Sequence, residues 1–160
     1  MRICFRLLYS SFLLSILVAC VDEEGSAKKN TFWNLTTHKV TVNYFRQGSS
    51  LPDKNIYLIA SERKEISYGH RHGSGPGLAY AIEMSELADS AIVAFDDSIT
   101  ITHHSYRIPA GTTGAIAQTS TRSIFNSLSY VGTKQIKGKL PIYEDTYFIT
   151  DSDYLYALDH

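Results

Sequence analysis

The sequence feature that most constrains the fold is residues 89–104, DSAIVAFDDSITITHH, whose pattern predicts two adjacent β-strands. Residues 91–95 are all apolar, as in a strand that is buried on both faces of a sheet. From residue 98 onward, apolar and polar residues alternate, which places Ile101 and His103 on one face of a second strand. Two aspartates separate the runs and favour a turn, so the stretch predicts a β-hairpin.

Shorter segments predict further strands on both sides of this hairpin. They are residues 31–34, 38–46, 55–60, 64–68, 78–83 and 141–149, with 114–118 as a further candidate inside a long loop. Loops rich in Gly and Ser separate them, and the basic segment 132–139 is interpreted as a turn. Strands that recur about every eight to twelve residues, with turn signals between them, are typical of an all-β sandwich or barrel.

The C-terminal residues carry a helix signal. Thr150 stands where an N-cap is expected, and Asp151 and Asp153 follow in the first turn, where acidic side chains are stabilising. The fold predicted for the chain is therefore all-β. We expect a single antiparallel β-sandwich or barrel-like domain with a short C-terminal helical turn.

The N-terminal residues predict a targeting signal. Arg2 and Arg6 precede an apolar run at 7–18, which is too short to cross a bilayer as a helix but has the length of the core of a signal peptide. The run ends in Leu17-Val18-Ala19-Cys20. This ending resembles the bacterial lipobox. The resemblance implies cleavage before Cys20 and a diacylglyceryl thioether on its sulfur, a lipid anchor that further acylation makes stable.

The lipobox resemblance divides the chain into three parts. Residues 1–19 are expected to be the signal peptide, 20–30 the lipidated cysteine and a flexible tether, and 31–160 the β-rich globular domain. Acidic residues at 22–24 are similar to the export signal of Bacteroidetes surface lipoproteins, which implies the bacterial outer membrane and exposure at the cell surface. An acidic but unspecific linker on a periplasm-facing protein is the alternative.

Four segments also resemble a group of small Bacteroidetes cell-envelope lipoproteins of unassigned function. They are ASERKEISYG, DSAIVAFDDSITITH, RSIFNSLSY and YFITDSDY. None of the four contains a catalytic signature. The resemblance implies a β-rich envelope domain and says nothing about an activity.

Charge and cysteine content exclude several classes of protein. Two of the 15 basic residues lie in the signal peptide, which leaves 13 against 16 acidic residues and a formal net charge of −3. No basic cluster is large enough to follow a phosphate backbone, so nucleic-acid binding is disfavoured. Cys4 leaves with the signal peptide, so the mature chain has no pair of cysteines for a disulfide and depends on an apolar core.

One cluster of side chains is a candidate for chemistry. His70, His72 and His103, with His104 beside the last, have the residue type of a transition-metal site. Arg71 between the first two would oppose a cation, and the surrounding loop is rich in glycine. The alternative is that the loop histidines are solvated and that His103 lies on one face of a strand.

Other candidates are less specific. Asp96 and Asp97 could form an acid pair, but adjacent residues of a strand point apart and Asp favours turns. Tyr143 and Tyr147, with Tyr154 and Tyr156 further on, could form a binding face or line the margin of the core. No catalytic residue and no cofactor is assigned.

The function predicted from the sequence is therefore general. We expect a lipid-anchored, non-enzymatic interaction or structural domain, held at the membrane through Cys20, with a protein or glycan partner that the sequence does not identify. The alternative is a metal-dependent or hydrolytic activity centred on His70, His72 and His103.

Overall fold

The computed structural model describes residues 26–71, 80–106, 108–110, 112–137 and 140–160. Sheet A has the order β5-β1-β9-β8 and contains β1 (Ser26–Asn34), β5 (Arg63–Arg71), β8 (Tyr130–Lys137) and β9 (Leu140–Ile149). Sheet B has the order β3-β2-β6-β7, with β4 also paired to β2, and contains β2 (Val40–Arg46), β3 (Ser49–Ser50), β4 (Ile56–Leu58), β6 (Ser90–Phe95) and β7 (Ile99–His104).

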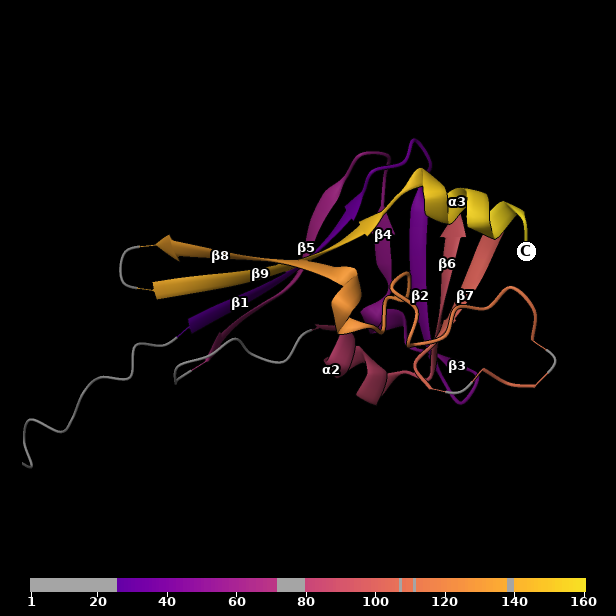
Figure 1. The fold of residues 1–160 in the computed structure, drawn as a ribbon, viewed down its shortest axis with the longest axis horizontal. Coiled ribbons are helices and arrows are strands. Elements are labelled where there is room, and N and C mark those ends of the chain that lie inside the picture. Colours follow the sequence, from indigo (N-terminus) through magenta and orange to yellow (C-terminus); the bar gives the residue numbers. More distant parts are fainter. Residues whose placement is uncertain (1–25, 72–79, 107, 111, 138–139) are drawn as a thin grey trace, which may run out of the picture.

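Helices are few and short in the described part of the chain (Figure 1). They are the α-helices α2 (Tyr80–Leu87) and α3 (Asp151–Leu158) and the 3-10 turns η1 (Pro52–Lys54) and η2 (Ser127–Ser129). None of them is long and apolar enough to cross a membrane. The predicted β class is confirmed, and the two sheets as described do not close into a barrel.

The predicted hairpin at 89–104 is present. Strands β6 and β7 pair in antiparallel register, with Ala91 opposite His103 and Val93 opposite Ile101. Residues 96–98 form the turn between the two strands. The alternation also predicts the buried face correctly, because Ile101 is 4% and His103 3% exposed.

The core is one cluster of buried side chains from both sheets, α2 and the segment before β8. Phe32 from β1 and Tyr147 from β9 pack against each other with ring centroids 5.3 Å apart, and both are buried. Tyr44 from β2 contacts the ring of Phe125, which comes from the long segment before β8. Phe32 also contacts the first residue of α2, Tyr80, at 5.7 Å, so this helix closes one side of the core.

Two predictions of local structure are wrong, each for a physical reason. The apolar start of 78–83 suggested a strand, but 80–87 form α2, whose Tyr80, Ala81 and Met84 are buried at helical spacing. The basic segment 132–139 was interpreted as a turn, but 130–137 form β8, an edge strand whose residues after Tyr130 are all exposed. Such a strand carries no apolar alternation to predict it.

The pairing of the terminal strands also differs from expectation. Strand β1 starts at Ser26 rather than at residue 31, and it pairs in parallel with β9, so the fold is not wholly antiparallel. Residues 114–118 contribute only a single bridge, between Ile116 and His103. The C-terminal element is an eight-residue helix, longer than the single turn that was predicted.

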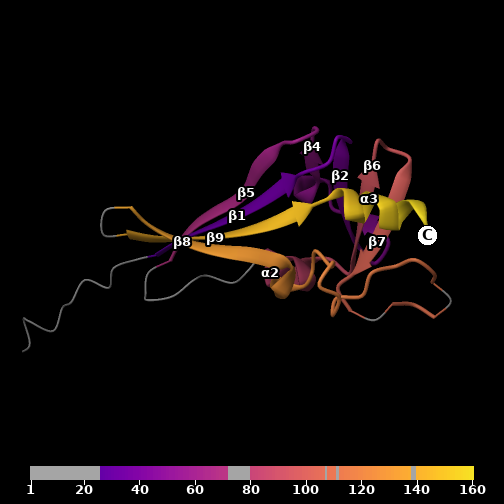
Figure 2. The same cartoon turned by 45° about the horizontal axis from the view of Figure 1, so that its top comes forward.

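One end of sheet A extends away from the core (Figures 1 and 2). We call this extension the arm and define it as residues 26–30 of β1, 131–137 of β8 and 140–145 of β9. We call sheet B, the two α-helices and the ends of sheet A that pack against them the body. Both views show the first residues of β1 near the outer end of the arm, opposite the body.

Candidate functional site

His103 lies in the buried core, on the inward face of β7. Its Nδ1 accepts a hydrogen bond from the backbone N–H of Ile124 at 3.3 Å. Burial lowers the pKa of His103 to about 3, and the neighbouring charges of His104 and Arg122 act in the same direction. The ring is therefore neutral at physiological pH, and its other nitrogen carries the proton.

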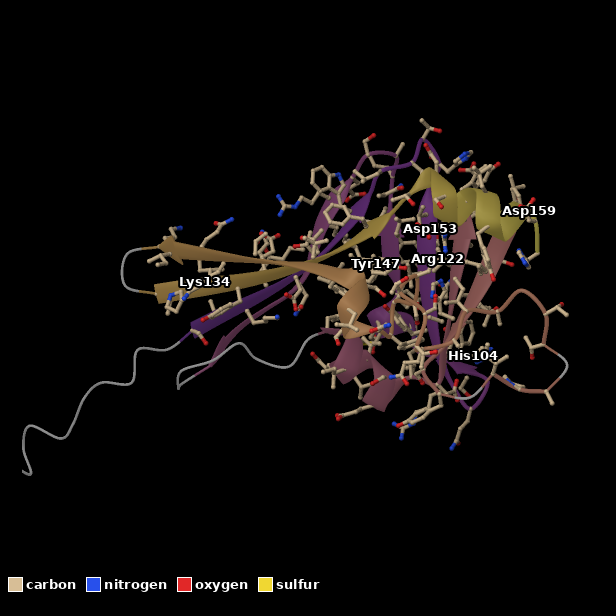
Figure 3. The ribbon with its side chains drawn as sticks, in the orientation of Figure 1. His104, Arg122, Lys134, Tyr147, Asp153 and Asp159 are labelled. Carbon is tan, nitrogen blue, oxygen red and sulfur yellow. The ribbon has the colours of Figure 1, made fainter. Side chains whose placement is uncertain are left out.

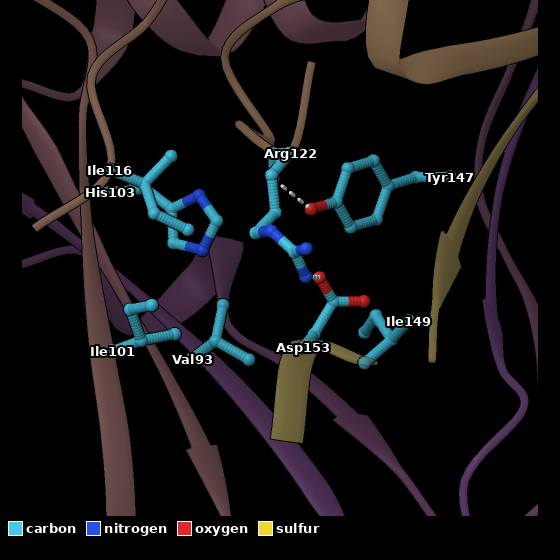
Figure 4. Close-up of a pocket in the computed structure, with 8 residues that line it drawn as sticks. All are labelled: Val93, Ile101, His103, Ile116, Arg122, Tyr147, Ile149 and Asp153. Atoms are coloured by element: carbon cyan, nitrogen blue, oxygen red, sulfur yellow. Dashed lines mark hydrogen bonds and ion pairs between the residues drawn. The ribbon is translucent and has the colours of Figure 1, made fainter. Parts of the chain in front are cut away.

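A polar cluster lies beside His103, between α3 and the long loop that joins β7 to η2 (Figures 3 and 4). The guanidinium of Arg122 donates to the carboxylate of Asp153 at 2.7 Å, and the hydroxyl of Tyr147 donates to the backbone carbonyl of Arg122 at 2.6 Å. The other oxygen of Asp153 accepts from the backbone N–H and the hydroxyl of Thr150, at 2.8 and 2.9 Å. These hydrogen bonds connect the loop to β9 and to α3, so each side chain of the cluster has a structural role.

The cavity inside this cluster is very small. Figure 4 shows it enclosed by His103, Arg122, Tyr147 and Asp153 with aliphatic side chains of both sheets, and its volume is about 10 Å³. That is close to the minimum for a single water molecule. A substrate does not fit, so the cluster fixes α3 and the loop to the core and does not form an active site in this conformation.

The histidines predicted as metal ligands lie in different parts of the fold. His103 is in sheet B, whereas the backbone of His70 lies near the end of β5, opposite Ala27 in sheet A. His72 lies outside the described residues, as does Cys20. In the described part of the chain, no group of three His, Cys, Asp or Glu side chains is placed to hold a metal ion.

A histidine that the sequence did not single out, His38, forms a pair with an aspartate. Its Nδ1 lies 2.6 Å from a carboxylate oxygen of Asp96, and its ring stacks on that of Tyr154 at 3.9 Å. The hydrogen bond from His38, together with the one from the backbone of Lys39, lowers the pKa of Asp96. Among the described residues, no hydroxyl or thiol is bonded to the second ring nitrogen of His38, so the pair lacks the nucleophile of a catalytic triad.

The two aspartates act as turn residues. Asp96 and Asp97 have φ of 49° and 60°, a left-handed conformation that Asp tolerates better than most residues. Both carboxylates accept hydrogen bonds from Lys39. Its backbone N–H donates to Asp96, and its side-chain amine donates to Asp97. The alternative of an acid pair is thus not supported by the geometry of these side chains.

A second, wider cavity is a groove between β4, β5, the η1 turn and α2. Its volume is about 220 Å³, and Ile56, Ile66, Tyr80 and Met84 form its apolar part. Its charged lining comprises Asp53, Lys54, Lys64, Glu65 and Glu83. Charged side chains thus outnumber the apolar ones in this groove, which is more polar than the usual small-molecule site.

The tyrosines near the C-terminus do not form a common binding face. Tyr147 is buried in the core, and burial raises its pKa far above the ordinary range. Tyr143 lies on the arm under the amine of Lys134, 5.6 Å from the ring centroid. Tyr154 and Tyr156 pack along α3 against His38 and Arg122.

The arm contains a network of charges around Glu144. Glu144 is 5% exposed and accepts hydrogen bonds from Thr31, at 2.8 Å, and from Arg63, while Lys29 lies 3.7 Å away. Burial acts to raise the pKa of Glu144, but these hydrogen bonds and charges outweigh it, so the pKa lies below its usual range. On the neighbouring positions, Lys28 pairs with Asp145.

Comparison with known proteins gives no further guide. The chain matches no protein-family model, no curated protein and no solved structure.

Besides His38, the sequence analysis did not identify the Arg122–Asp153 pair or the exposed strand β8. Arg122 and Asp153 come together only through the tertiary fold, and no spacing in the sequence links them. The exposed residues of β8 did leave a signal, because only Gly138 and Lys139 separate Lys137 from its pairing partner Leu140. Two residues that include glycine are the usual length of a hairpin connection.

Proposed function

We propose that the protein is a lipid-anchored module of the bacterial cell envelope that binds a partner through its body and catalyses no reaction. Cys20 carries the lipid in this proposal, and the arm stands between the lipid and the body. We further propose that the body is sandwich-like and that the protein is displayed on the outer membrane.

The observation that carries the proposal is the position of Ser26. Strand β1 starts there, near the outer end of the arm, and only five residues separate it from Cys20. Even a fully extended chain of this length spans only about 20 Å. A lipid on Cys20 would therefore bring the end of the arm close to the bilayer.

The opposite end of the molecule would then face away from the membrane. The exposed part of β8, residues 131–137, has a length of about 23 Å at the rise of a β-strand. This length supports a role for the arm as a spacer. The groove beside α2 belongs to the body and is the surface that we propose for a protein or glycan partner.

Absence of catalysis is supported by how the polar side chains are used. His103 accepts a backbone hydrogen bond, Arg122 and Asp153 bind each other, and Asp96 holds a turn. Each group thus has a structural role that explains its position. No observation specifically favours the metal-dependent or hydrolytic alternative.

The direct test is acylation in cells. Radiolabelled palmitate should enter the wild-type protein, which should fractionate with the membrane. Protease added to intact cells should degrade it, because the protein is displayed on the surface. Cys20→Ser should lose the label and leave the membrane fraction, whereas Ser26→Ala is the matched control that keeps both. An unlabelled wild-type protein would contradict the proposal, as would a stoichiometric transition metal that disappears in the His70→Ala, His72→Ala double variant.

A further inference from the structure

The outer edge of the arm combines exposed positive charge with an exposed apolar side chain. Strand β8 forms one edge of sheet A, and its residues from Val131 to Lys137 are all exposed. Ile136 is 72% exposed, and Lys134 and Lys137 lie on either side of it. An isoleucine so exposed on an unpaired strand edge is available for contact with an external apolar surface.

The charges of these two lysines are not compensated within the arm. Each described acid of the arm has its own basic partner, since Asp145 pairs with Lys28 and Glu144 pairs with Arg63. Neither Lys134 nor Lys137 forms an ion pair with a described carboxylate, and Lys134 instead lies over the ring of Tyr143. The edge therefore presents net positive charge in a protein whose mature chain is negative overall.

We propose that this edge of the arm is a second membrane contact, in which Lys134 and Lys137 bind anionic phospholipid headgroups and Ile136 enters the interfacial region. The proposal rests on the lipid anchor at Cys20, which places the end of the arm at the bilayer. It goes beyond the anchor because it predicts how the module is oriented on the surface.

Position along the strand predicts an order of effects. Lys137 is the last described residue of β8 before the hairpin connection, and Lys134 lies about 10 Å further from that end at the rise of a β-strand. Electrostatic attraction to a membrane surface decays over about 8 Å at physiological ionic strength. Lys137 should therefore contribute more than Lys134.

A competing occupant of the edge is a second copy of the same strand. Antiparallel pairing of two β8 edges would bring their lysines together, and lysine on an edge strand is a common means of preventing such pairing. Charge therefore favours an anionic surface over self-association as the partner of this edge.

The experiment uses the acylated protein, reconstituted into vesicles and recovered by flotation. A spin label is attached at Gln135→Cys in the arm or, as control, at Arg46→Cys in the body, and its accessibility to a membrane-soluble relaxing agent is measured. Acylated Cys20 does not react, so the labelling is specific. The arm label should contact the bilayer when vesicles contain phosphatidylglycerol and lose that contact with phosphatidylcholine alone, whereas the body label should remain in water in both.

Variants test the two lysines. Each replacement of lysine by glutamine should lower the ratio of docked to undocked arms by up to about fivefold, and Lys134→Gln, Lys137→Gln together by up to about 25-fold. Lys39→Gln, Arg46→Gln removes the same charge from exposed positions of the body and should change nothing. Circular dichroism establishes that both double variants fold.

Three outcomes are distinguishable. Flotation with an arm label that responds to lipid charge and to the two lysines supports the contact. Flotation with an arm label that stays in water whatever the lipid overturns the contact and leaves the anchor intact. Protein that does not float with either kind of vesicle overturns the proposed function, and the arm contact with it.

Discussion

The body and the arm share the strands of sheet A but are stabilised by different forces. In the body, large apolar side chains such as Phe32, Tyr44 and Phe95 are completely buried. In the arm, the backbone ladder and the charges around Glu144 hold the strands together, and the outer strand is exposed along its length. Free energy of burial thus favours the body, whereas specific polar pairs determine the register of the arm.

The difference suggests a division of roles. A close-packed core tolerates little change of volume, so the body is expected to keep one rigid shape. The exposed outer edge of β8 can bind an external partner without disturbing the core. Substitutions in the core should therefore cost more stability than substitutions on the outer strand of the arm.

Truncation of a core side chain should destabilise the whole protein. Phe95→Ala removes a ring that is 0% exposed, and loss of such a ring costs about 3 to 5 kcal/mol of the free energy of unfolding. The matched variant in the arm is Ile136→Ala, which should change the free energy by less than about 0.5 kcal/mol. Urea unfolding measures the free energy of both variants. Equal losses would contradict the difference between the body and the arm.

The arm should depend on its buried charge. Glu144→Ala leaves Arg63 and Lys29 without their shared partner and should lower the free energy of unfolding by about 2 to 3 kcal/mol. Glu65 pairs with Lys29 at 3.3 Å but its side chain is 46% exposed, so Glu65→Ala should cost less than about 1 kcal/mol. Hydrogen exchange of β9 amides would localise the loss, and equal costs for the two variants would count against a charge-dependent arm.

The body should lose stability in acid because of His103. Its pKa is about 3 in the folded state and about 6.5 when unfolded, so the unfolded chain binds the extra proton between these values and stability falls as pH decreases through this window. At pH 5 the loss relative to pH 7 should be about 2 kcal/mol.

The variant His103→Leu removes this proton and should reduce the difference between the free energies of unfolding at pH 7 and pH 5 by that amount. Ile101→Val, on the same buried face of β7, should lower stability at both pH values without changing their difference. An unchanged difference in His103→Leu would show that the ring is accessible to protons in the folded state.

Loss of the ion pair that attaches α3 to the long loop should have the smallest effect on stability. Arg122→Leu removes the ion pair with Asp153, whose side chains are 33% and 16% exposed, and should cost about 1 kcal/mol. Because Asp153 still accepts from Thr150, α3 should remain helical while its amides exchange faster. Loss of helix content in this variant would mean that the pair forms the helix as well as holding it in place.

Sequence alone predicts those parts of the fold where local pattern and burial agree. The hairpin of β6 and β7 alternates with a period of two, and its buried face follows from that period. Strand β9 and the start of α3 likewise carry their own signals, alternation in one case and an N-cap threonine in the other. In these segments each residue's environment is set mainly by its neighbours in the chain.

The remaining elements depend on contacts between distant residues. Strand β8 is exposed after Tyr130, so its pairing with β9 leaves no apolar pattern, and the first residues of β1 are polar although Ser26 and Asn30 are buried. Parallel pairing of β1 with β9 joins the two ends of the domain and has no local signal. The cluster of Arg122, Tyr147 and Asp153 likewise has no local signal in the sequence. Burial of His103, by contrast, follows from its position on the apolar face of β7.

The most direct test of the account is the mass of the N-terminal peptide of the protein recovered from cell membranes. We predict a peptide that begins at Cys20 and carries a diacylglyceryl group on its sulfur, which ties the arm to the bilayer. A peptide that begins elsewhere, or a Cys20 with a free thiol, would contradict the account.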